Sequence, residues 1–365
     1  MSGFVTRCVG LLFILAITPP ALAAEPGGWQ PARAADYLDE RAKEWFAYAS
    51  AHRGAGATQT TCVSCHTLVP YALARPALGR SNETSEKLVA NVRSRVDAWA
   101  ELDTPKFRLL YDFNEPKKKE SWGTEAVVNA AVLAFDDSYH GRTEPIANTR
   151  KAFANLWQVQ TPSGELAGSW DWLDFKYEPW ESPNGRYSGV ALAAVAVGTA
   201  PGYYSPGADS ETDAKVRLLA GYLKRGFAGQ NLHNRAWALW ASAKLNGVLT
   251  PQERTAAIAE LLERQRDDGG WNLASLGKFT RKDGTDQDMA SDGYATGLVL
   301  HALQTAGVPK SDPKVARGLA WLRENQAAGG EWRGISLNKN RDPATHPGKF
   351  MTTAATAFAV LALND

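Results

Sequence analysis

Two kinds of helix-period segment alternate along the chain. Six are amphipathic, with apolar residues at helical spacing and many charges between them: residues 36–50, 84–102, 144–160, 210–228, 251–268 and 312–326. Six others are rich in alanine and nearly uncharged: residues 62–78, 123–135, 186–198, 232–247, 291–307 and 351–363. A helix that is apolar all round must be buried, whereas an amphipathic helix covers it from outside. The alternation therefore predicts an all-α repeat array with an inner and an outer layer.

A closed ring satisfies this pattern better than an open array, because a ring has no exposed apolar ends. We predict an α/α toroid of about six helical hairpins, forming one domain over residues 37–365 after a linker at 24–36. The longest connections lead from an outer helix into an inner one. They should lie together on one face, where binding sites are usually found.

The turns carry a second repeat in which a glutamine precedes a tryptophan. Gln265 precedes Trp271 and Gln326 precedes Trp332 at the same spacing, and Gln160 with Trp170 is a stretched copy. These repeats resemble those of the terpenoid cyclase and protein prenyltransferase superfamily, in particular squalene-hopene cyclases. The resemblance implies a toroid around a central cavity, with each glutamine and tryptophan joining adjacent hairpins.

The first 23 residues have the pattern of a signal peptide. Arg7 precedes an apolar run that contains Cys8, and small residues at Ala21 and Ala23 mark a cleavage site. We therefore expect a periplasmic or secreted protein. No other apolar run approaches the length of a membrane span, so none is expected. The net charge of +1 gives no electrostatic basis for a nucleic-acid partner, and the run Lys117–Lys119 is interpreted as a solvated loop.

Cys62, Cys65 and His66 form a Cys-x-x-Cys-His motif and include the only cysteines beyond the signal peptide. This is the attachment motif of c-type haem, in which both thiols bind the porphyrin and the histidine binds iron. Export suits this chemistry, because haem is attached outside the cytoplasmic membrane. A Cys62–Cys65 disulfide or redox dithiol is the main alternative. Zinc is another, although the motif supplies at most three ligands.

Candidates for a second iron ligand lie at the starts of the predicted inner helices. In a closed ring the last inner helix neighbours the first, which brings Met351 level with His66. Methionine is a common sixth ligand of cytochrome iron. We expect Met351 in this role, followed by His346, Met289 and His233, or an iron with one open position.

Other candidate residues come from the chemistry of the resembling families. Asp286 and Asp288 are similar to the acidic motif of hopene-type cyclases, but Met289 replaces its last acid. Asp292 matches one zinc ligand of the prenyltransferases, whereas Tyr294 and Met351 stand near where the cysteine and histidine would be. Asp288, Asp292 and Glu125 are further candidates for polar chemistry at the cavity mouth, or helix caps.

The loop 170–181 combines five aromatic residues with four carboxylates, which could bind and cleave a sugar as in six-hairpin glycosidases and lyases. Two functions therefore remain open. One is a redox or electron-transfer protein with one haem c, acting on a small apolar, isoprenoid-like molecule or a partner protein. The other is a haem-free toroid that binds or converts a terpenoid or a glycan. Whether the protein is an enzyme stays open.

Overall fold

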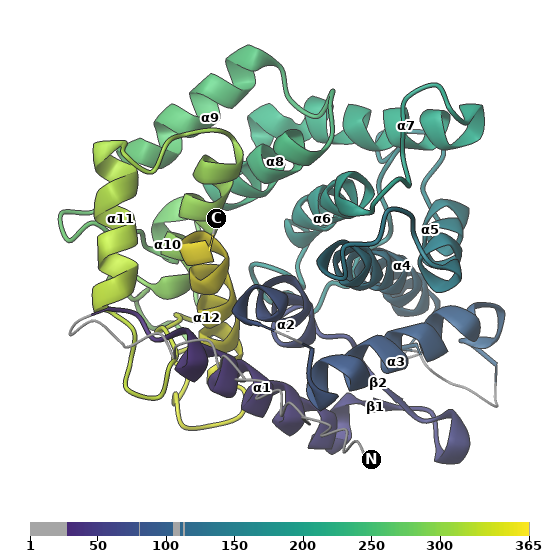
Figure 1. Cartoon of the computed structure of the whole chain (residues 1–365), viewed down its shortest axis with the longest axis horizontal. Helices are drawn as coiled ribbons and strands as arrows, with labels where there is room; N and C mark the ends of the chain where they lie inside the picture. Colours follow the sequence, from purple (N-terminus) through teal and green to yellow (C-terminus); the bar gives the residue numbers. More distant parts are fainter. Residues whose placement is uncertain (1–27, 80, 105–109, 112–113, 365) are drawn as a thin grey trace, which may run out of the picture.

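The computed structural model describes residues 28–79, 81–104, 110–111 and 114–364. Outer and inner helices alternate without exception (Figure 1). The outer helices are α1 (Pro31–Ala47), α3 (Glu83–Asp97), α5 (Ala147–Gln158), α7 (Ser210–Gly226), α9 (Pro251–Glu263) and α11 (Pro313–Glu324). The inner helices are α2 (Leu68–Ala74), α4 (Glu115–Tyr139), α6 (Gly185–Thr199), α8 (Leu232–Lys244), α10 (Gly293–Thr305) and α12 (Lys349–Asn364). A small antiparallel hairpin, β1 (His52–Arg53) and β2 (Thr60–Thr61), precedes α2.

The inner helices form a closed ring. Each packs on the next, and α12 contacts both α10 and α2, so that the last hairpin meets the first. Figure 1 shows the outer helices surrounding this ring, with α1 beside α12. The predicted all-α toroid of six hairpins is thus confirmed.

Small residues allow the inner helices to approach one another closely. A Cβ atom at Gly297 of α10 would lie 2.4 Å from the backbone carbonyl carbon of Phe358 in α12, nearer than side chains tolerate. The alanine-rich composition of these helices therefore reflects close backbone packing at the centre.

The glutamine–tryptophan repeats join successive hairpins. The Trp271 indole donates to Leu261 O at 2.7 Å, and the Gln265 amide donates to Lys314 O, at the start of the next outer helix, at 2.7 Å. Trp332 donates to Leu322 O at 2.7 Å in the same way. The longer repeat makes the equivalent contacts: Trp170 donates to Leu156 O, and Gln160 donates to Lys215 O.

The last repeat closes the ring. Gln326 accepts a hydrogen bond from Gln30 N at 2.6 Å and donates to Gln30 O at 3.1 Å. Trp29 packs against Trp332, with ring centres 6.2 Å apart. These contacts join the segment before α1 to the last hairpin, as the other repeats join consecutive ones.

Two predicted boundaries were wrong. Helix α1 begins at Pro31 within the expected linker 24–36, because proline suits a first helical turn. Helix α4 begins at Glu115, so Lys117–Lys119 lie in its first turn rather than in a loop. Asn114 caps this helix by accepting a hydrogen bond from Lys117 N at 2.9 Å. The predicted signal peptide 1–23 lies outside the described residues.

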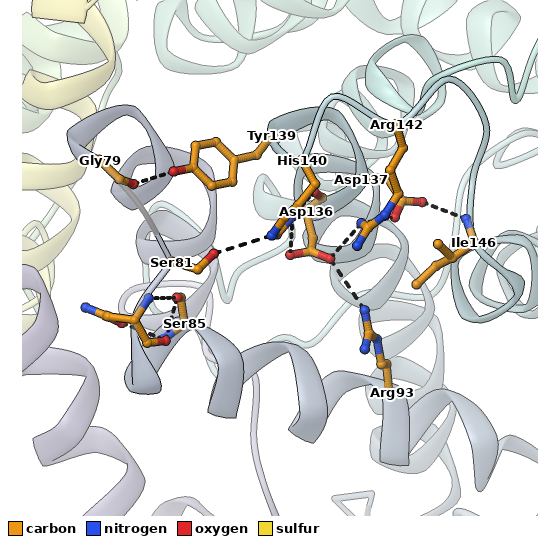
Figure 2. A network of polar contacts seen from close by, with 11 residues as sticks. Gly79, Ser81, Ser85, Arg93, Asp136, Asp137, Tyr139, His140, Arg142 and Ile146 are labelled. Atoms are coloured by element: carbon orange, nitrogen blue, oxygen red, sulfur yellow. Dashed lines mark hydrogen bonds and ion pairs between the residues drawn. The ribbon is translucent and has the colours of Figure 1, made fainter. Parts of the chain in front are cut away.

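A polar network stabilises the ring face opposite the long loops (Figure 2). Asp137, fully buried near the end of α4, accepts hydrogen bonds from Arg142 at 2.6 Å and Ile146 N at 3.1 Å. Asp136 forms ion pairs with Arg142 at 3.2 Å and with Arg93 of α3 at 3.6 Å. The short turns on this face are thus held by local capping and pairing.

Candidate functional site

The connections from outer to inner helices gather on one face of the ring, as predicted. We call residues 48–67 the motif loop, 159–184 the aromatic loop, 264–292 the acidic loop and 325–348 the C-terminal loop. Asn338 of the C-terminal loop connects three of them. Its side-chain amide donates to Glu178 O at 2.6 Å and accepts from Glu178 N at 2.8 Å. Its backbone carbonyl accepts from Lys282 N at 2.8 Å.

The Cys-x-x-Cys-His motif lies just before the first inner helix rather than within it. Cys62 follows β2 and donates its backbone N–H to Ala51 O at 2.8 Å; a turn over 65–67 leads into α2. The helix begins at Leu68 because Pro70 has no N–H to bond a carbonyl one turn earlier. Ser64 O accepts from Val69 N at 3.0 Å and fixes the entry.

His66 is held by aromatic packing. Its ring stacks on Phe350 of α12, with centres 3.7 Å apart, and meets the edge of Trp45 of α1 at 4.9 Å. Its Nδ1 lies 2.8 Å from the Thr67 hydroxyl, whereas Nε2 makes no hydrogen bond to any residue that the structure describes. Burial, with smaller contributions from nearby cations, lowers the pKa of His66 to about 3. The imidazole is therefore neutral near pH 7, the form that binds metals.

A cavity of about 270 Å³ lies beside His66. Met351 lines it too, so the structure brings the motif histidine and the predicted second ligand to one cavity. The remaining lining comes from the aromatic loop, the C-terminal loop and the start of α12: Tyr177, Glu178, Trp180, Glu181, Ser336, Asn338, Arg341, Pro347 and Phe350.

The two cysteines are free thiols, and they line a separate space that shares Glu181 with this cavity. Cys62 Sγ lies 3.9 Å from the Tyr111 hydroxyl, and both cysteines line a small space of about 20 Å³. Burial raises the pKa of both thiols, most strongly that of Cys65. Cys65 also borders the centre of the ring, where only about 30 Å³ stays open among apolar side chains. The central cavity that the resemblance implies is therefore small at this point of the ring.

Trp180 and Glu181 separate these spaces. Trp180 lines both the His66 cavity and the ring centre, and Glu181 lines both the His66 cavity and the space beside the thiols. Burial raises the pKa of Glu181 to about 7. From the sequence, Glu181 was only one of four carboxylates in its loop. Its proximity to the motif depends on how the aromatic loop folds back, which local patterns do not encode.

The acidic candidates do not gather at this cavity. Glu125 is buried in α4, where Arg95 donates to its two oxygens at 2.5 and 2.8 Å. Asp292 is the N-cap of α10 and accepts from Ala295 N at 2.9 Å and Leu273 N at 2.7 Å. Burial raises the pKa of Asp292 to about 7. Both residues have structural partners that account for their positions.

Asp286 and Asp288 lie on the acidic loop, outside the lining of the ring centre. Asp286 is exposed, and Asp288 is half-buried and paired with Arg333. Met289 is 48 % exposed, so it does not accompany Met351 at the cavity. The similarity to the acidic motif of hopene-type cyclases is therefore not matched by a position facing the ring centre.

The other histidines differ in their surroundings. His346 stacks on Trp45, with ring centres 5.9 Å apart, and its Nδ1 lies 3.7 Å from Glu44. His233 is buried in α8, with Tyr294 OH 2.9 Å from Nε2 and Asn234 Oδ1 3.2 Å from Nδ1. His346 thus belongs to the aromatic cluster around His66, whereas both ring nitrogens of His233 are already engaged.

The aromatic residues of loop 170–181 do not form a flat exposed row. Trp170 and Trp172 are buried in the ring, Phe175 and Trp180 are half-buried, and Tyr177 is the exposed one of the five. A stacking platform for sugar rings is absent from this described segment. Among the residues that the structure describes, no group of three or more His, Cys, Asp or Glu side chains is arranged to hold a metal ion.

These features define a class: an α/α toroid with a polar and aromatic cavity on its long-loop face. Residues 289–365 match the family described as the squalene-hopene cyclase C-terminal domain. The fold and this match make the chain similar to the toroids of the terpenoid cyclase-like superfamily. No sequence among the curated proteins matches.

Solved structures share the architecture at low identity. A structure of UGL with dGlcA-Glc-Rha-Glc aligns at 12% identity over 92% of this chain and 95% of its own, with a TM-score of 0.51. The unsaturated glucuronyl hydrolase from Bacillus sp. GL1 aligns at 12% identity over 92% and 96%, with a TM-score of 0.49. At such identity the likeness extends to the fold alone. No helix within the described ranges is long and apolar enough to cross a membrane.

Proposed function

We propose that this toroid carries one haem c, joined covalently to Cys62 and Cys65, with His66 as an iron ligand and a role in electron transfer. The observation that carries the proposal is His66 itself. It is a half-buried, neutral histidine whose Nε2 lacks a hydrogen bond to the described residues, placed directly after two free cysteines and beside a cavity. Metal-binding histidines usually have their other ring nitrogen hydrogen-bonded, and Thr67 supplies that contact.

The donor set fits the group. Each thiol would add across one vinyl double bond, its hydrogen passing to the vinyl carbon, so attachment needs no oxidant. The raised thiol pKa values keep the sulfurs protonated before attachment. Met351 lines the same cavity and would be a second iron ligand, and Arg341, also in the lining, could pair with an anionic substituent. When bound, the haem would supply reversible one-electron chemistry.

The proposal requires enough space for a haem at the motif. A group bound to both thiols and to His66 must occupy the His66 cavity and the space beside the cysteines together. Glu181 lines both spaces and lies between them, so binding displaces this side chain. The proposal also requires export, as the predicted signal peptide provides. A small apolar molecule or a partner protein would exchange electrons at the cavity mouth.

The test is expression with a haem-maturation system, followed by extraction with acid acetone. Colour that stays with the wild-type polypeptide and is lost in the Cys62→Ser, Cys65→Ser double variant supports covalent attachment. Ser64→Ala, between the two cysteines, is the matched control and should keep the colour. A colourless protein with a Cys62–Cys65 disulfide would overturn the proposal.

A further inference from the structure

A second and larger cleft, of about 410 Å³, adjoins the His66 cavity on the same face. Ser336 and Arg341 line both, so the two spaces share a wall. Five cationic side chains line the cleft: Arg281, Arg333, Lys339, Arg341 and Lys349. Only two carboxylates, Asp288 and Glu331, accompany them. Positive charge is therefore concentrated here, although the chain as a whole is nearly neutral.

Three of these cations have no carboxylate partner among the described residues. Arg333 pairs with Asp288, and Lys349 lies 3.7 Å from Glu44. Within that part of the chain, no ion pair is formed by Arg281, Lys339 or Arg341. Glu331 lines the same cleft, and Asp286 is near Arg281 in the sequence, but neither is paired with them. Unpaired charges that line a concave surface attract counter-ions.

Arg281 makes the strongest case, because it is only 9% exposed. Its guanidinium donates to two backbone carbonyls, Ser336 O at 3.1 Å and Asp286 O at 2.6 Å, which fix its orientation without neutralising it. Burying a charge without an opposite charge is costly. A bound anion would offset that cost, and arginine is suited to carboxylate and phosphate oxygens.

The cleft is held in shape by contacts between its two loops. Gln287 of the acidic loop donates to Leu337 O at 3.0 Å, and Asp283 accepts from Asn340 N at 2.7 Å. Gly348, Lys349 and Thr352 bring the start of α12 to the cleft, where the helix dipole also favours negative charge. Arg281, whose guanidinium is held by two backbone carbonyls, loses little entropy on binding an anion.

We infer that this cleft binds a small oxyanion with at least two negative charges, of the phosphate or carboxylate type, beside the His66 cavity. The size of the cleft suits a small molecule, and its concave cationic wall suits a ligand whose charge is concentrated. This inference uses none of the motif residues. It does not rest on the haem proposal, although Arg341 lines both spaces.

The experiment is calorimetric titration of the full mature chain with inorganic pyrophosphate and, separately, with citrate, at constant ionic strength. Saturable binding is expected for one or both probes, and their ranking distinguishes phosphate from carboxylate chemistry. Lys339→Ala and Arg341→Ala should each weaken binding about 10-fold, the size expected for one charge-assisted contact. Neither side chain makes a hydrogen bond or ion pair to the described residues, so folding should be unaffected.

Arg150→Ala is the matched control, an exposed cation on α5 that pairs with Glu144 away from the cleft. Equal weakening by this control, or no saturable binding of either probe, would overturn the inference. The titration is repeated on the Cys62→Ser, Cys65→Ser variant. Binding that occurs only in this variant and vanishes in haem-loaded protein would assign the cleft to haem side groups, which overturns the inference but leaves haem attachment intact.

Discussion

Gln326 links the segment before α1 to the last hairpin, and its removal gives a measurable prediction. Gln326→Ala deletes three hydrogen bonds: from Gln30 N at 2.6 Å, to Gln30 O at 3.1 Å and to Gly330 O at 2.9 Å. A hydrogen bond contributes about 0.5–1.5 kcal/mol net, and these are partly solvated. We expect the free energy of unfolding to fall by roughly 2 kcal/mol.

Gln265→Ala is the matched control in the middle of the ring. Gln265 donates to Gly269 O and Lys314 O, but its own carbonyl oxygen has no partner. This variant loses two bonds rather than three, so its destabilisation should be smaller by about 1 kcal/mol. It also leaves the contact between the first and last hairpins intact.

Urea unfolding and amide hydrogen exchange test the difference. In Gln326→Ala, faster exchange should concentrate at the start of α1 and in the turn before Trp332, whereas Gln265→Ala should affect α9 and α11. If both variants lose the same stability and α1 keeps its protection, Gln326 does not close the ring and the reasoning is wrong.

Three further predictions concern individual side chains. In oxidised, haem-loaded protein, Met351→Ala should abolish the weak methionine-to-iron charge-transfer band in the absorption spectrum; an unchanged band would exclude Met351 as a ligand. Glu125→Gln should cost about 3 kcal/mol in urea unfolding because it removes the negative charge that buried Arg95 contacts at 2.5 and 2.8 Å, and adding Arg95→Met should recover part of that loss. Burial lowers the pKa of His233 to about 4 from an ordinary value of 6.5. The unfolded state then binds more protons, so stability should fall by up to about 1.4 kcal/mol per pH unit from pH 6.5 down to about 4; His233→Gln should flatten this decline, and an unchanged slope would refute the assignment.

Repetition made the fold predictable. Alternating helix types and the regular glutamine–tryptophan turns indicated a two-layer ring, because each hairpin must bury one apolar helix behind one amphipathic helix. The starts of helices were harder to predict where capping residues stood among charged residues. Asn114 and Pro116 begin α4 ahead of three lysines that, taken alone, indicate a loop.

The site was predictable only in part. The motif identified Cys62, Cys65 and His66 from local spacing, and ring closure brought Met351 to the same cavity. Glu181 and Arg341 were not predicted as neighbours of His66. Both residues reach His66 from long loops. The paths of these loops depend on hydrogen bonds such as those between the Asn338 side chain and the Glu178 backbone, which no periodic sequence pattern predicts.

Ring closure and the candidate site are physically coupled. His66 comes from the first hairpin, whereas Phe350, Met351 and Arg341 come from the last, so their shared cavity exists only where the two ends of the array meet. The contact of Gln326 with Gln30 holds α1 against this same junction, and α1 carries Trp45, which packs on the His66 ring. Loosening that contact should therefore disturb the His66 environment before the rest of the ring unfolds. Gln265→Ala, which loosens a contact between two hairpins in the middle of the ring, should leave that environment unchanged.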